Sequence, residues 1–132
     1  MKNKNIDIEQ TYHEWKDFLC AKGFKVTYED EYKKGEKFIA FLGCTPKIVV
    51  QIYLGNFRTN TETGSCICAD FSSCFNKISQ CPFYSDITID KSEFWECIEI
   101  LMDAGKDWAN NFGRLEKIGG SWVCNPSIVK NN

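Results

Sequence analysis

The sequence predicts an α+β fold: one antiparallel sheet of four to five strands, with an N-terminal helix and a long C-terminal helix packed on it. Apolar residues recur at helical spacing near both ends of the chain, whereas apolar and polar residues alternate through its middle. Short polar segments join the alternating stretches, and this favours antiparallel pairing because parallel strands need long crossovers. The length of 132 residues suits one hydrophobic core, so we expect a single domain, 1–132.

Residues 7–22 are expected to form the first helix. Asp7 is a plausible N-cap, because its short side chain can accept a hydrogen bond from the first turn. Gly23 suits the left-handed position that ends a helix. The apolar stripe of this helix is expected to consist of Ile8, Tyr12, Trp15 and Leu19.

The middle of the chain predicts the strands of the sheet. The expected strands are Phe24–Glu29, Phe38–Leu42, Ile48–Leu54, Ser65–Phe71 and, more weakly, Phe83–Ile89. In the first strand, Phe24, Val26 and Tyr28 are expected on one face, and Asp30–Lys37 is expected to turn the chain. The third strand is apolar on both faces, which is typical of a central strand. Residues 72–80 are expected to be a short helix or a turn.

Residues 91–112 predict the long C-terminal helix, about 33 Å in length at 1.5 Å per residue. Asp90 and Glu93 resemble a capping box at its start, and Gly113 is expected to end it. Gly105 lies on the apolar stripe, which suggests a close backbone approach there. Residues 113–132 are expected to form a tail that docks on the body through Trp122 and Val123.

Composition excludes several classes of function. The net charge is −2, and only two of the sixteen basic residues are arginines, which argues against nucleic acid as a partner. No apolar run approaches the ~20 residues that cross a bilayer, so no membrane partner is expected. The first ten residues lack the apolar region of a secretory signal. We therefore expect a cytoplasmic protein whose cysteines are reduced.

The eight cysteines allow two interpretations. Free cysteines commonly act as small buried apolar residues, and several lie in apolar periodic segments here. Alternatively, a local C-x-C-x5-C-x6-C cluster could bind zinc or provide a reactive thiol. This cluster comprises Cys66, Cys68, Cys74 and Cys81. No C-x2-C pair is present, so we expect no metal and no cofactor.

Residues that could perform catalysis are few. His13 is the only histidine, so any histidine base would have to be His13. It lies off the apolar stripe, beside acidic residues of the first helix. Cys20 is about 10 Å further along the helix axis, too far for direct contact. The chain also lacks the nucleotide-binding, zinc-protease and serine-hydrolase motifs, so we assign no catalytic residue and expect no enzyme.

Acidic residues are concentrated in the C-terminal helix. Residues 90–112 carry six acids and two lysines, a net charge of −4, whereas the rest of the chain carries +2. The face opposite the apolar stripe is expected to carry Glu96, Glu99, Asp103 and Asp107. A second acidic group is expected at a turn comprising Glu29, Asp30 and Glu31. Both groups could be solvated surface, or they could bind a basic partner protein.

The chain resembles bacterial toxin-immunity proteins of polymorphic or contact-dependent growth inhibition systems. The resemblance lies in size, acidity and helix–sheet–helix order, over the segments YHEWKDFLCAKGF, KIVVQIYLGNF and KSEFWECIEILMDAGKDWANNF. It implies a stoichiometric inhibitor that neutralises a cognate toxin, possessing a basic cleft, through an acidic surface. Secretion chaperones are similar in size and charge and are a further alternative.

Overall fold

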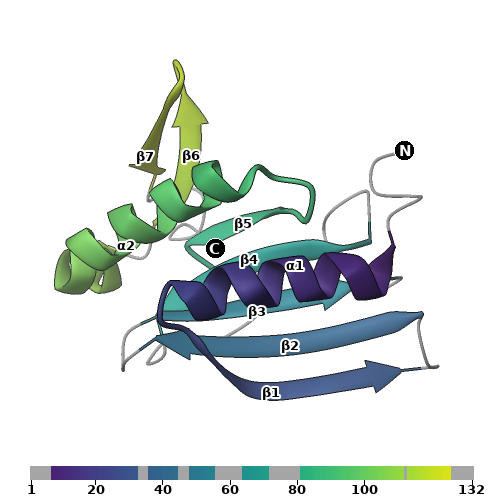
Figure 1. Ribbon diagram of the computed structural model, residues 1–132. Coiled ribbons are helices and arrows are strands. Elements are labelled where there is room, and N and C mark those ends of the chain that lie inside the picture. Colours follow the sequence, from purple (N-terminus) through teal and green to yellow (C-terminus); the bar gives the residue numbers. More distant parts are fainter. Residues whose placement is uncertain are drawn as a thin grey trace.

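The computed structural model describes residues 7–32, 36–44, 48–55, 64–71, 81–111 and 113–125, with only the backbone at residue 44 and at residues 106–111, 124 and 125. Its centre is a five-stranded antiparallel sheet in the order β1-β2-β3-β4-β5 (Figure 1). The strands are β1 (Lys25–Tyr32), β2 (Lys37–Cys44), β3 (Ile48–Leu54), β4 (Cys66–Phe71) and β5 (Phe83–Asp86). The predicted α+β class with one antiparallel sheet is confirmed.

Helix α1 (Ile8–Ala21) has the predicted boundaries because both ends are capped by the expected residues. The Asp7 carboxylate accepts a hydrogen bond from the backbone N–H of Gln10 at 3.0 Å. Gly23 has a φ of +102°, and the N–H of Phe24 donates to the carbonyl of Leu19. This left-handed residue with its backward hydrogen bond is a Schellman ending.

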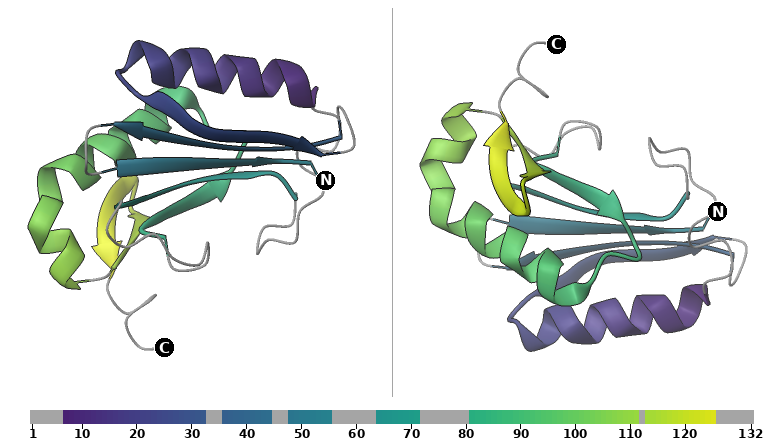
Figure 2. Two further views of the ribbon diagram at one scale, coloured as in Figure 1. Left: turned by 90° about the horizontal axis from the view of Figure 1, so that it is seen from below. Right: turned by 90° about the horizontal axis from the view of Figure 1, so that it is seen from above.

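The core lies between the helices and one face of the sheet (Figure 2). Strand β3 is the middle strand, as predicted, and turns its even-numbered residues toward the core: Ile48, Val50, Ile52 and Leu54. Phe94 of the second helix contacts both Trp15 of α1 and Phe83 of β5 edge to face, with ring centroids 5.1 and 5.4 Å apart. A single core therefore joins both helices to the sheet.

Strand β1 differs from the prediction at two places. A bulge between Val26 and Tyr28 reverses the alternation, so Tyr28 lies on the face opposite Val26 and is 44% exposed. The strand also continues to Tyr32, and the expected turn beginning at Asp30 is wrong. The extra length arises because β2 begins at Lys37 and supplies pairing partners as far as Tyr32.

Helix α2 (Lys91–Asn111) is not the straight helix that the sequence predicts. Gly105 has φ +48° and ψ −118°, which interrupts the helical backbone after about four turns. No described atom outside the helix backbone lies within 4 Å of the position that a Cβ would occupy at Gly105. The close approach expected there is wrong, because the glycine serves a change of backbone direction instead.

The tail contains a hairpin in addition to the strands expected from the sequence. Strands β6 (Arg114–Ile118) and β7 (Ser121–Asn125) pair across Gly119 and Gly120, both at positive φ. Trp122 packs on Phe83, with centroids 5.8 Å apart, so the predicted docking of this residue is confirmed. Val123 is 40% exposed, and its predicted docking is wrong because neighbouring residues of a strand face opposite sides.

Two predictions fall, wholly or in part, on residues that the structure does not describe. Residues 72–80, expected as a short helix or turn, lie outside the described residues, as do residues 56–63 of the expected polar loop. Within the described ranges, neither helix has the length and apolar character needed to cross a bilayer.

Candidate functional site

The acidic face predicted for α2 is exposed along the regular part of the helix, before the interruption at Gly105. Glu96, Glu99 and Asp103 are all exposed, whereas Phe94, Cys97, Ile98 and Leu101 on the other side are buried. Within the described ranges, no hydrogen bond or ion pair joins these three carboxylates to another side chain. Asp107 lies past the kink, where side chains are not described. We call Glu96, Glu99 and Asp103 the α2 acidic face.

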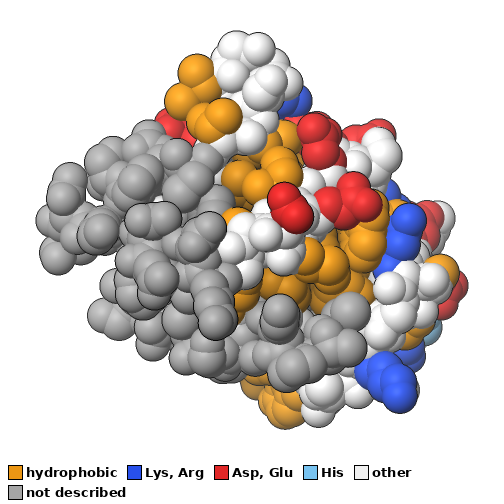
Figure 3. All heavy atoms as spheres, turned by 90° about the vertical axis from the view of Figure 1, so that its left-hand side faces the viewer, with side chains coloured by type: hydrophobic (Ala, Val, Ile, Leu, Met, Phe, Trp, Pro, Cys, Tyr) orange, Lys and Arg blue, Asp and Glu red, His pale blue; other side chains and the backbone are white. Residues whose placement is uncertain are grey.

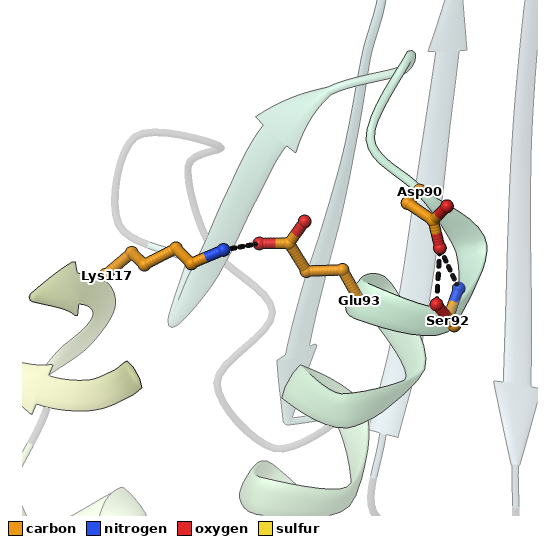
Figure 4. A network of polar contacts seen from close by, with 4 residues as sticks. All are labelled: Asp90, Ser92, Glu93 and Lys117. Carbon is orange, nitrogen blue, oxygen red and sulfur yellow. Dashed lines mark hydrogen bonds and ion pairs between the residues drawn. The ribbon is translucent and has the colours of Figure 1, made fainter. Parts of the chain in front are cut away.

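The start of α2 is fastened to the hairpin by an ion pair (Figure 4). Asp90 caps the helix by accepting a hydrogen bond from the backbone N–H of Ser92, and the bonds from Ser92 lower the pKa of the Asp90 carboxyl. Glu93 does not complete the predicted capping box; its carboxylate accepts a hydrogen bond from the Lys117 ammonium at 2.6 Å. This pair raises the pKa of Lys117 and links β6 to α2.

Apolar side chains adjoin the α2 acidic face. Ile100 is half-buried and lies on the same side of the helix, four residues after Glu96 and three before Asp103. On the hairpin, Ile118 is 55% exposed and Val123 is 40% exposed. Figure 3 shows this side of the molecule, where acidic side chains lie among hydrophobic ones. Apolar anchors next to charged groups are the usual composition of a protein-binding surface.

The second predicted acidic group is divided between the two faces of the sheet. Glu29 and Glu31 lie on the face that α1 covers, and Asp30 lies on the other. The Tyr12 hydroxyl donates a hydrogen bond to Glu29 at 2.7 Å. Burial raises the pKa of Tyr12 most, and this hydrogen bond raises it further. The Tyr28 hydroxyl donates to Asp30 at 3.3 Å. The prediction of one contiguous acidic turn is therefore wrong.

A small groove opens between α1 and the β1–β2 edge of the sheet. Its volume is about 100 Å³. The groove is lined by Ile8, Glu9, Tyr12, His13, Lys16, Glu29, Glu31 and Phe38. The histidine singled out from the sequence thus lies at a groove among carboxylates; Cys20, further along α1, is not among the lining residues.

On the face of the sheet opposite α1, three of the four cysteines of the predicted cluster come together. Cys66 and Cys68 lie on β4, and the Cys68 thiol is hydrogen-bonded to Cys81 just before β5. The Gln51 amide donates to the Cys81 sulfur, and the Cys81 thiol donates to Asp70, both at 3.9 Å. We call Cys66, Cys68 and Cys81 the thiol cluster.

Burial opposes ionisation of Cys66, Cys68 and Cys97. It raises the pKa of Cys66 to about 12, against a weaker opposing effect of the Tyr84 hydroxyl. The pKa of Cys68 is raised by its bond to Cys81 and by burial. Burial and the nearby Glu93 and Glu96 carboxylates raise the pKa of Cys97 to about 12. Thiolates are the reactive and metal-binding form of cysteine, so these environments disfavour both chemistries.

The zinc alternative finds no site in the described residues. Among them, no group of three or more histidine, cysteine, aspartate or glutamate side chains is arranged to hold a metal ion. Cys74, the remaining member of the predicted set, lies outside the described ranges.

The sequence reading missed the role of Lys117 and the association of Glu29 with Tyr12. Gly119-Gly120 between two short β-prone stretches is a recognisable signal for the hairpin that carries Lys117, but no local pattern indicates the pairing of Lys117 with Glu93. No local pattern reveals the second, because Tyr12 and Glu29 are seventeen residues apart. Comparison with protein-family models, curated proteins and solved structures finds no match to this chain.

Proposed function

We propose that the protein is a binding module that neutralises a cognate toxin as a stoichiometric inhibitor, with the α2 acidic face as its contact surface. The observation that carries the proposal is the exposure of Glu96, Glu99 and Asp103 on one side of α2. Such a surface attracts a partner with a basic cleft, which mainly increases the association rate and the selectivity for that partner.

The surroundings of the acidic face support the proposal. Ile100 lies among the carboxylates, and Ile118 and Val123 are exposed on the adjacent hairpin. Buried apolar side chains supply most of the affinity in protein interfaces, whereas charges at the rim steer the encounter. The Lys117–Glu93 ion pair links the hairpin to α2, so one partner could contact both elements.

The test compares two variants with the same change in net charge. Glu99→Lys with Asp103→Lys reverses the α2 acidic face. Glu9→Lys with Asp17→Lys reverses two exposed acids on α1 and serves as the matched control. With a partner purified from the host, we expect the α2 variant to associate at least about tenfold more slowly at low salt. The control should keep the wild-type rate, and the difference should shrink at high salt, where charges are screened.

The partner's own activity separates toxin inhibition from its alternatives. The proposal is supported if the partner is toxic or hydrolytic on its own and inactive in an equimolar complex with this protein. An exported partner without such activity favours the secretion chaperone. Equal association rates for the two charge-reversal variants would refute the role of α2. The thiol cluster is not proposed as a second function, since the raised pKa values of Cys66 and Cys68 oppose thiol chemistry.

A further inference from the structure

We draw no further inference here: the strongest candidate, the exposed surface patch with Ile118 and Val123 on the β6–β7 hairpin, carries nothing beyond its place beside the α2 acidic face, because nothing in the described part of the chain shows what covers it.

Discussion

Thiol reactivity provides a quantitative test of how burial sets the chemistry of the cysteines. Cys66 is fully buried, and its pKa is about 12, compared with about 8.5 for an ordinary thiol. At pH 8, about a quarter of an ordinary thiol is ionised, but only about 0.01% of a thiol with a pKa of 12. The smaller ionised fraction alone slows alkylation of Cys66 by about three orders of magnitude.

Access adds to this difference. Iodoacetamide reaches Cys20 in the native state because Cys20 is exposed. It reaches Cys66, Cys68 and Cys97 only when the core opens, so their labelling also depends on the free energy of opening. We therefore expect Cys20 to be alkylated first and the three buried thiols at least about a thousandfold more slowly.

The assay is native alkylation at pH 8 under reducing conditions, quenched at intervals and followed by peptide mass spectrometry of each cysteine. In guanidinium chloride the rates at the four positions should converge. Cys20→Ser is the control and should remove only the fast phase that belongs to this position. Labelling of Cys66 within about tenfold of Cys20 in the folded protein would refute the reasoning, and it would revive the thiol-dependent alternative.

Further predictions concern stability. The pKa values of Cys66 and Cys97 are higher in the folded than in the unfolded state, so the contribution of these thiols to the free energy of unfolding is complete below about pH 8.5 and declines toward pH 12. Urea titrations should show a loss of up to about 1.4 kcal/mol per pH unit for each thiol. In Cys97→Ala the free energy of unfolding should depend less steeply on pH. Gly105→Ala should lower the free energy of unfolding by about 1–2 kcal/mol, since its φ is +48°; a gain near 1 kcal/mol, usual in regular helices, would show that α2 is continuous. Phe94→Ala should cost about 3–5 kcal/mol and lower Tm by roughly 10–20 °C in calorimetry, whereas Phe94→Leu should cost about 1–1.5 kcal/mol; a loss below 1 kcal/mol for alanine would contradict its place in the core.

Much of the fold follows from patterns within single segments. Asp7 and Gly23 mark the ends of α1, because capping depends on side chains within one turn of the helix end. The apolar character of both faces of β3 places it in the middle of the sheet. The exposure of Glu99 and Asp103 also follows from helical periodicity, so the α2 acidic face could be predicted from sequence.

The groove and the thiol cluster could not be predicted in the same way. Glu29 points toward α1 only because the bulge between Val26 and Tyr28 shifts the alternation by one residue. Its partner Tyr12 is brought to it by the packing of α1 on the sheet. Cys81 meets Cys68 because β4 and β5 are neighbours in the sheet.

The sequence by itself determined the class of fold, a main sheet of four to five strands and the acidic outer side of α2, since periodicity and caps act over a few residues. The tertiary structure alone decided which carboxylates line the α1 groove, which thiols meet, and that Glu93 pairs with Lys117 rather than capping its helix. These depend on strand register and on contacts between distant segments. A single bulge or kink changes them, because it turns every following side chain while leaving the local pattern intact.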